Sequence, residues 1–315
     1  MPTRRALVIG TGVAALATTY RLLRSDWEVT LADEQNPRPA DEFPFPLTGI
    51  GFEAAERFGL LPALSERRQP PCALVRVDAT GLPLAVRPRP GRRSPVLRPQ
   101  DVIEVLHEAL GPLPTRSAPI SLTPDSWGVT AEFANHDEDW FDLVVGADGP
   151  DSQVRQALFG PAPAPVGWST LSDRIAMRPT CAVAMDLETR SVRLHPLHDG
   201  NAAVSFRWPA GIAWPDAFTD LGWLVPELLS LVDGSHRVRT PQEPPSRWTH
   251  RRVVLIGSAA WGTDATAALS LGAAELLGDA LDIFPDEDTS LRWWDQTLRP
   301  CARRATKRLV AVHRS

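Results

Sequence analysis

The sequence is short of several residue types. Its 315 residues include three cysteines, one tyrosine and one lysine, Lys307. Cys72, Cys181 and Cys301 form no Cys-x-x-Cys pair, which argues against a disulfide framework and leaves no metal-ligand spacing among the thiols. No apolar run approaches the ~20 residues that span a bilayer, and none follows Met1 as a secretory leader requires. We therefore expect a cytoplasmic protein without a membrane segment or a metal site.

Charge of either sign is not in large excess. The formal net charge is −5, so the chain lacks a strong electrostatic footprint for nucleic acid. Its arginine-dense segments, 87–98 and 299–308, are short and interrupted, and we interpret them as solvated surface. Hydrophobic residues make up 43% and charged residues 23%, which is ordinary for a globular protein. The expected partner is a small molecule, and nothing in the sequence indicates an oligomeric state.

The first chemical motif follows a short apolar run at residues 6–9, typical of a buried parallel strand. Gly10 permits a tight turn, Gly12 lets a pyrophosphate approach the backbone, and Ala15 lets the following helix pack closely. The N-terminus of that helix presents free N–H groups to the phosphates. Asp33, at the end of the next predicted strand, can accept hydrogen bonds from ribose hydroxyls. The unit predicts a dinucleotide site rather than a structural turn, and by itself it does not separate FAD from NAD.

A second motif follows the apolar run at residues 141–147. Asp148 and Gly149 come directly after it, and Ser152 and Arg155 lie in the first turns of a predicted helix. An acid just past the carboxyl end of a parallel strand stands where α/β sheets bind ligands. The alternative is an Asp-Gly turn whose aspartate or serine caps the helix.

A third segment, residues 252–261, again combines a strand with small residues. Gly257 and Ser258 follow the apolar run, Trp261 ends the segment, and a helix is predicted to begin at about Gly272. In chain order, the three segments make the sequence resemble the FAD-dependent monooxygenases of the para-hydroxybenzoate hydroxylase type. That family carries G-x-G-x-x-G/A, then D-G-x-x-S-x-x-R, then G-D-A-A-H. The segment that begins at Arg98 is similar to the family's R-x-x-L segment.

The resemblance implies a set of FAD contacts. Gly10, Gly12, Ala15 and Asp33 would hold the ADP half. Arg98, Asp148, Gly149, Gly257 and Ser258 would lie near the pyrophosphate, the ribityl chain and the isoalloxazine ring. The helix N-terminus at Gly272 would point at the flavin pyrimidine ring. NADPH is the electron donor that the resemblance implies.

The third motif departs from the family pattern. Ser258 replaces the aspartate that bonds a ribityl hydroxyl, and a neutral hydrogen bond is typically about half as strong as a charge-assisted one. Trp261 replaces the histidine, and the loop 262–271 is about two residues longer than the family's. Two interpretations stay open. Either FAD is retained through its ADP half, or the flavin pocket is remodelled and FAD is structural or lost.

The fold expected is α/β, with a Rossmann-like doubly wound FAD-binding domain and an inserted antiparallel β-sheet that binds the substrate. We assign residues 1–73, 97–160 and 248–315 to the first domain, and 74–96 and 161–247 to the second. The candidate pocket residues are Arg193, His195, Arg207, Trp208 and Trp261. Alternation along a strand puts the first two on one face, and a wet outer face is the alternative for the polar residues.

Two functions are carried forward. The first is an FAD-dependent monooxygenase acting on an aromatic or polyketide-like small molecule in bacterial secondary metabolism. The second is a redox-neutral cyclase or isomerase on the same scaffold, which the changes at Ser258 and Trp261 favour. No set of side chains stands out as a nucleophilic or acid–base centre, so no catalytic residue is assigned.

Overall fold

The computed structural model describes residues 3–33, 43–88, 94–160, 167–232, 238–240, 243–262 and 267–311, with side chains to residue 304. Residues 263–266 of the predicted loop 262–271 therefore lie outside the described residues. The described chain contains no helix that is both long and apolar enough to cross a bilayer. Two hydrophobic cores, each under its own large sheet, organise the chain.

The main sheet has the Rossmann-like order β16-β17-β11-β1-β2-β7. All neighbouring pairs are parallel except β16 with β17. Its central strands are almost entirely buried apolar residues, as the short hydrophobic runs predicted. The strands are β1 (Arg5–Ile9), β2 (Glu28–Asp33), β7 (Thr115–Ser117), β11 (Leu143–Gly146), β16 (Thr249–His250) and β17 (Val253–Leu255).

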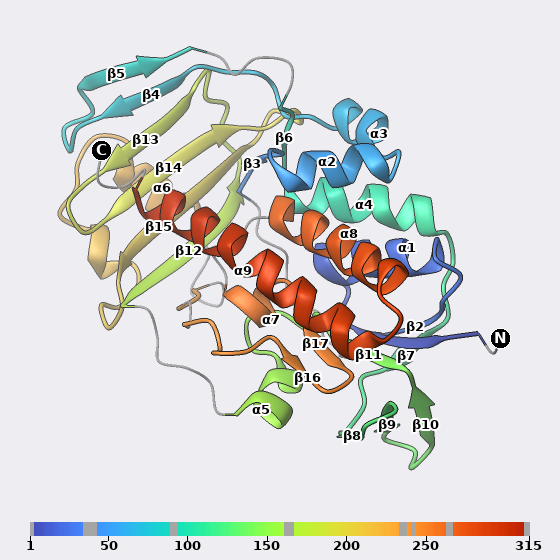
Figure 1. Cartoon of the computed structure of the whole chain (residues 1–315). Coiled ribbons are helices and arrows are strands. Elements are labelled where there is room, and N and C mark those ends of the chain that lie inside the picture. Colours follow the sequence, from blue (N-terminus) through green and yellow to red (C-terminus); the bar gives the residue numbers. More distant parts are fainter. Residues whose placement is uncertain are drawn as a thin grey trace.

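Helices pack on this sheet and on one another (Figure 1). Close approach depends on small residues, because a Cβ on Gly51 would lie 2.2 Å from the Ala268 carbonyl oxygen and one on Gly272 would lie 2.4 Å from Ile50. These contacts join α2 to α8. The helices are α1 (Val13–Leu23), α2 (Ile50–Arg57), α3 (Leu61–Glu66), α4 (Pro99–Leu110), α5 (Gln153–Phe159), α7 (Ser258–Trp261), α8 (Ala267–Ile283) and α9 (Glu287–Ala311).

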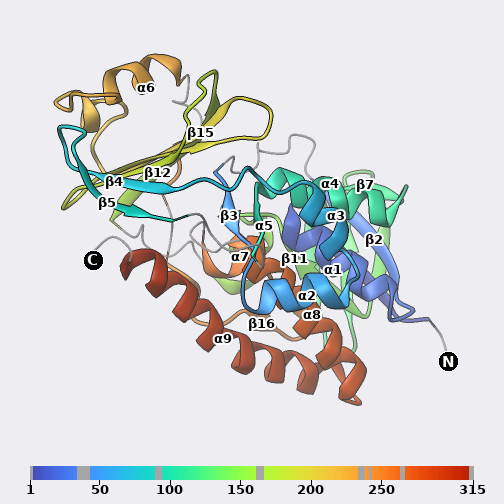
Figure 2. The ribbon, with the colours of Figure 1, turned by 90° about the horizontal axis from the view of Figure 1, so that it is seen from above.

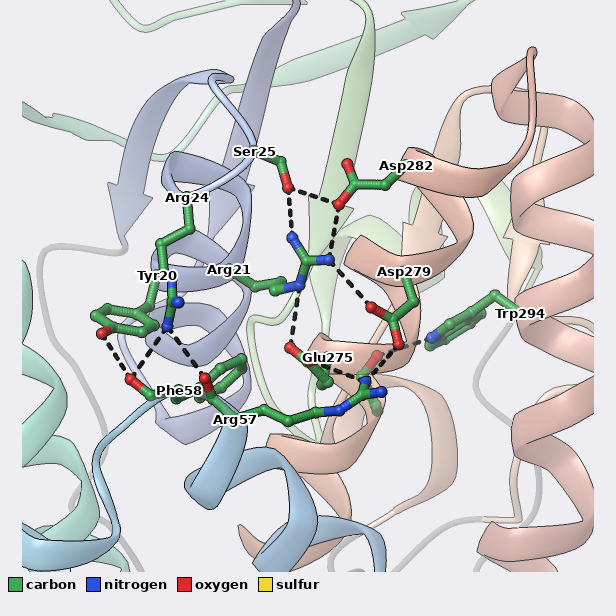
Figure 3. A network of polar contacts seen from close by, with 11 residues as sticks. Tyr20, Arg21, Arg24, Ser25, Arg57, Phe58, Glu275, Asp279, Asp282 and Trp294 are labelled. Atoms are coloured by element: carbon green, nitrogen blue, oxygen red, sulfur yellow. Dashed lines mark hydrogen bonds and ion pairs between the residues drawn. The ribbon is translucent and has the colours of Figure 1, made fainter.

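An ion-pair network ties α1, α2 and α8 together (Figure 3). The Arg21 guanidinium lies 3.0 Å from Glu275, 3.1 Å from Asp279 and 2.8 Å from Asp282. Arg57 reaches Glu275 at 3.1 Å and Asp279 at 2.7 Å. Charges that share several partners in a network hold more firmly than isolated surface pairs, so the network fixes α2 and α8 against α1, the helix that follows the first motif.

The second sheet has the order β12-β15-β14-β13-β4-β5 and is antiparallel except between β13 and β4. The turn at Asp199 joins β14 to β15 as predicted. One face is apolar and packs on α6 (Val225–Leu231) and the short helix η1 (Asp216–Phe218). The strands are β4 (Leu74–Val77), β5 (Pro83–Arg87), β12 (Trp168–Ile175), β13 (Ala182–Asp186), β14 (Ser191–Pro196) and β15 (Ala202–Pro209).

Figure 2 shows α6 on one side of the second sheet and the helices of the main-sheet unit on the other. The face of the second sheet that points away from α6 is called the polar face below. The chain also forms two small sheets that the sequence did not indicate. They consist of β3 (Phe45–Pro46) with β6 (Val96–Leu97), and of β8 (Ser121–Pro124), β9 (Val129–Glu132) and β10 (Glu138–Phe141).

Candidate functional site: the carboxyl edge of the main sheet

The three sequence motifs meet at one edge of the main sheet. In the parallel register, Ile9 pairs with Gly146 on one side and with Ala32 on the other, and Gly146 pairs with Leu255. The loops that follow these four strands therefore emerge side by side. This carboxyl edge is where open α/β sheets bind ligands, and we call it the motif edge.

The two glycines of the first motif have different neighbours. Gly10 has a φ of +120°, and a Cβ there would lie 2.3 Å from the Ala147 carbonyl oxygen. This glycine is thus required by the contact between the first and second motifs. At Gly12, a Cβ would meet no described atom within 4 Å. Space at Gly12, beside the first N–H groups of α1, is what a pyrophosphate requires.

The acid at the end of β2 already has a partner from the first motif. The Thr11 hydroxyl donates a 2.8 Å hydrogen bond to Asp33 Oδ2. The bond holds the carboxylate beside the Gly10–Gly12 turn, where a ribose would lie if the pyrophosphate occupied that turn. Ala15, fully buried, packs in the core on the sheet side of α1.

Asp148 makes the helix-capping contact that its sequence context allowed, and its second carboxylate oxygen stays without a partner among the described residues. Its Oδ2 accepts a 3.1 Å hydrogen bond from the Val154 N–H, which is a helix-capping contact. Its Oδ1 is buried and has no hydrogen-bond partner among the described residues. Burial raises the pKa of the carboxyl above its usual value of 3.8, against the opposing effect of the Ser152 hydroxyl. A buried oxygen without a partner is costly, so this atom fits a ligand hydroxyl.

The rest of the second motif joins it to the third. Ser152 caps α5 by accepting a 2.9 Å hydrogen bond from the Arg155 N–H. The Arg155 guanidinium donates to the Ala259 carbonyl at 3.1 Å and to the Pro150 carbonyl. Burial lowers the pKa of Arg155, while the Asp148 charge raises it. Arg155 therefore acts as a brace between two loops of the motif edge.

The third motif packs directly on the first. A Cβ on Gly257 would lie 2.7 Å from the Ala14 methyl, and the φ of Gly257 is +70°. Ser258 begins α7 and is partly exposed at this edge. Gly149 has a φ of +87° and open space where a Cβ would be. Asp148 and Gly149 follow β11 and Ser258 follows the neighbouring strand β17, and these three residues are called the polar rim below.

Arg98 is buried and held by a neighbour. Its guanidinium lies 2.7 Å from Asp101 at the start of α4. Asp101 also accepts from Gln69 at 2.7 Å, and Gln69 accepts from the His198 N–H in the β14–β15 turn at 3.1 Å. Arg98 thus belongs to a network between α4 and the second sheet. Its contact with a flavin stays a prediction.

The expected helix start at Gly272 is wrong. α8 has already begun at Ala267, so Gly272 lies in its interior rather than at its N-terminus. The segment Ala-Ala-Leu-Ser-Leu is helical because it contains strong helix formers, and the glycine provides close packing on Ile50. Gly272 therefore has a packing role, and its assignment as a flavin contact has no support from the helix dipole.

Three of the candidate pocket residues share the polar face of the second sheet. Arg193 pairs with Ser205 and His195 with Ala203, and Arg207 follows two residues later on the same side of β15. Arg193 lies 3.3 Å from Asp186, and the Arg207 guanidinium stacks 3.5 Å from the Trp168 ring centroid. The shared face predicted for Arg193 and His195 is confirmed.

The two candidate tryptophans are elsewhere. Trp208 lies on the apolar face, fully buried, and its Nε1 donates to the Ile212 carbonyl at 3.0 Å. Its assignment to the pocket is wrong, because strand alternation turns it toward α6. Trp261 is 3% exposed, and its ring contacts Trp248 in the core of the main-sheet unit. Trp208 therefore does not line the polar face, and the assignment of Trp261 to the pocket has no support.

Sequence reasoning missed several residues around the site. A hydroxyl between the two motif glycines is a signal that could have indicated Thr11. Gln69 and Cys72 gave no such signal, because their partners His198 and His195 lie more than a hundred residues away. The described part of the chain holds no group of three or more His, Cys, Asp and Glu side chains that could bind a metal.

Comparison with known proteins addresses the fold. No protein-family model matches the chain. A flavin-dependent monooxygenase from an unknown prokaryotic organism is 22% identical over 333 residues, covering 95% of this chain and 86% of the relative. Tetracycline destructase Tet(55) superposes with a TM-score of 0.84 at 23% identity, covering 100% of this chain and 90% of the other. Klebsiella pneumoniae HpxO, complexed with FAD and uric acid, gives 0.79 at 19% identity, covering 97% and 87%. The chain therefore has the fold of the FAD-dependent aromatic hydroxylases that its motifs resemble.

Proposed function

We propose that this protein is an FAD-dependent monooxygenase acting on an aromatic or polyketide-like small molecule. The observation that carries the proposal is the motif edge, where four adjacent strand ends bring together an open glycine turn, the Asp33 carboxylate and a buried oxygen of Asp148. The sheet with the polar face lies beside this edge (Figure 2). A dinucleotide site next to a second, polar binding surface suits a cofactor that reacts with a separate substrate.

The residues present fit FAD. Space at Gly12 and the N-terminus of α1 would receive the pyrophosphate, and Asp33, oriented by Thr11, would bind the adenosine ribose. The buried Oδ1 of Asp148 would accept from the ribityl chain, with Ser258 beside it. When bound, FAD supplies the redox and oxygen chemistry, and the protein supplies binding, orientation and exclusion of water.

The substrate class is inferred from the second sheet and from the relatives. Arg193 and Arg207 place hydrogen-bond donors on the polar face beside His195, which suits oxygen-rich ring compounds. Tetracycline and uric acid, named for two of the similar structures, are both fused-ring molecules. NADPH as electron donor, a cytoplasmic location and a place in bacterial secondary metabolism belong to this proposal and await direct tests.

The test is a visible spectrum of the purified protein, recorded with FAD and then with NADPH under air. A bound-flavin spectrum that bleaches with NADPH and recovers with O2 would support the proposal. A protein that does not bind FAD would overturn it. Product formation without NADPH and O2 would instead identify a redox-neutral cyclase or isomerase, for which the uncharged Ser258 is the favouring observation.

A further inference from the structure

A thiol and an imidazole meet on the polar face of the second sheet. Cys72 Sγ lies 3.7 Å from Nε2 of His195 on β14. Cys72 belongs to the segment before β4 and is 123 residues from His195 along the chain. Within the described chain, the motif edge as assigned above uses neither residue.

A third group orients the imidazole. His195 Nδ1 lies 2.8 Å from the Pro196 carbonyl oxygen. A carbonyl oxygen only accepts, so Nδ1 carries the hydrogen of the neutral ring and Nε2 is left with the lone pair. The Cys72 S–H can therefore donate to Nε2. A nucleophile within reach of a base, and a base held by a third group, is the arrangement that activates catalytic cysteines.

The surroundings hold both partners in place. Two prolines precede Cys72 and restrict the chain that leads to it, and the next carbonyl, of Ala73, accepts from the Ala182 N–H at 2.9 Å. The His195 ring packs edge-on against Phe43, with centroids 6.5 Å apart. A main-chain hydrogen bond beside Cys72 and the ring packing of His195 thus hold the two residues in position.

The charge environment favours a neutral imidazole. The residue paired with His195 on β15 is Ala203, which carries no charge. On β14, Arg193 is paired with Asp186, and in the following turn His198 bonds Gln69 from the main-sheet unit. Burial lowers the pKa of His195, and the Pro196 carbonyl raises it by a smaller amount. A neutral imidazole is the form that can remove a proton.

We propose that Cys72 is a nucleophilic thiol with His195 as its general base, and that it reacts covalently with α,β-unsaturated carbonyl compounds. This activity goes beyond the proposed monooxygenase function and does not depend on a flavin. Conjugated enones and quinones are soft electrophiles, which thiols attack in preference to hard ones. The polar face would thereby capture such compounds as thioethers.

The step needs no oxidant or reductant. The sulfur forms a bond to the β-carbon of the enone while the carbon–carbon π bond breaks. The thiol proton passes to His195 Nε2 and then to the α-carbon of the resulting enolate. Imidazole returns to its neutral form, and the product is a thioether that contains all atoms of both reactants.

The experiment uses N-ethylmaleimide, itself an α,β-unsaturated carbonyl compound, on the full-length protein. Rates of modification at Cys72, Cys181 and Cys301 are followed by peptide mass spectrometry. All three thiols are partly buried and none is in a disulfide, so the other two serve as internal controls. We expect Cys72 to react at least ~10-fold faster at pH 7, in line with general-base assistance.

The pH dependence separates an assisted thiol from one that is merely accessible. An ordinary thiol with a pKa near ~8.5 loses about tenfold in rate per pH unit below it. Between pH 7.5 and 6.5, Cys181 and Cys301 should slow by about that factor. Cys72 should slow by less than ~3-fold, because the pKa of His195 is below its usual value. Equal slopes at the three thiols would overturn the proposal.

Variants identify the base. His195→Asn should slow Cys72 at least ~10-fold and restore the steep pH slope, whereas the rates at Cys181 and Cys301 should not change. His198→Asn is the matched control and should leave Cys72 as in the wild type. An unchanged Cys72 rate in His195→Asn would overturn the proposal. Should that variant not fold, the wild-type pH slopes decide. FAD binding is measured separately, so failure of the flavin function leaves this test intact.

Discussion

The Arg155 guanidinium donates a 3.1 Å hydrogen bond to the Ala259 carbonyl, which joins the second and third motifs across 104 residues of chain. Its other branch reaches the Pro150 carbonyl. Arg155 is 3% exposed, and a planar guanidinium can serve two carbonyls that diverge from one point. The shape of the motif edge thus depends on one buried cation that donates to a backbone carbonyl in each of the two loops.

Replacing Arg155 with lysine should weaken both stability and FAD binding. A lysine ammonium cannot span both carbonyls, and a hydrogen bond to a charged group contributes about 1.5–3 kcal/mol. Urea unfolding should show a loss of about that size, and an FAD titration should show weaker binding. Arg251→Lys is the control, because Arg251 donates to the Pro124 carbonyl at the surface. Equal losses of stability and of FAD affinity in the two variants would contradict this role of Arg155.

Replacing Gly12 with alanine should weaken FAD binding while leaving the stability of the protein nearly unchanged. A Cβ there meets no described atom within 4 Å, so stability should fall by no more than about 1 kcal/mol. FAD affinity should fall at least ~10-fold, because the methyl group occupies the pyrophosphate position. Gly10→Ala should instead destabilise the protein by about 2 kcal/mol or more, given its positive φ and the contact with Ala147. A Gly12→Ala protein with wild-type FAD affinity would place the pyrophosphate elsewhere.

Aspartate at Ser258 should tighten FAD binding. The family's carboxylate would be restored at the first residue of α7, where it can accept a charge-assisted hydrogen bond from a ribityl hydroxyl. We expect a decrease in Kd of up to about tenfold, corresponding to ~1.4 kcal/mol. Ser258→Asn is the control, because asparagine has nearly the size of aspartate but carries no charge. Isothermal titration of the three proteins with FAD makes the comparison, and weaker binding by the aspartate variant would argue against a flavin at this rim.

Asparagine at Asp148 should raise stability in a pH-dependent way. Burial raises the pKa of Asp148 in the folded protein, so the unfolded chain releases this proton first as the pH rises. Wild-type stability is therefore lost between the usual pKa near 3.8 and the raised folded value. The variant lacks this loss, and its Tm advantage should grow from pH 4 to pH 7.

Asp125→Asn is the opposite control for that measurement. Hydrogen bonds from the Trp127 and Gly128 N–H groups lower the pKa of Asp125. Its contribution to stability is complete above the usual pKa and is lost only at lower pH. The Tm difference of this variant should therefore stay constant from about pH 5 to pH 7. A Tm difference for Asp148→Asn that is equally flat would mean that its carboxyl is not perturbed.

The dinucleotide unit could be predicted from the sequence because its signals are local. The apolar run before Gly10, the helix after Gly12 and the acid at Asp33 all lie within one β–α–β stretch, and the spacing sets the turn, the dipole and the ribose contact together. The predicted helix start near Gly272 is wrong for a local reason as well, because a glycine inside a helix gives the same signal as a helix boundary.

The pairs of polar side chains that meet on the second sheet could not be predicted, because they depend on which strands become neighbours. Alternation separates Arg207 from Trp208 but does not say which side faces α6; packing on Phe218 and Val225 decides that Trp208 is the buried one. Likewise, Cys72 meets His195 only because β4 pairs with β13, which pairs with β14. The sequence by itself therefore determined the dinucleotide-binding unit, because its contacts lie within one β–α–β stretch of chain. The tertiary structure alone decided which side chains share a face, because that requires the register of strands far apart in the chain.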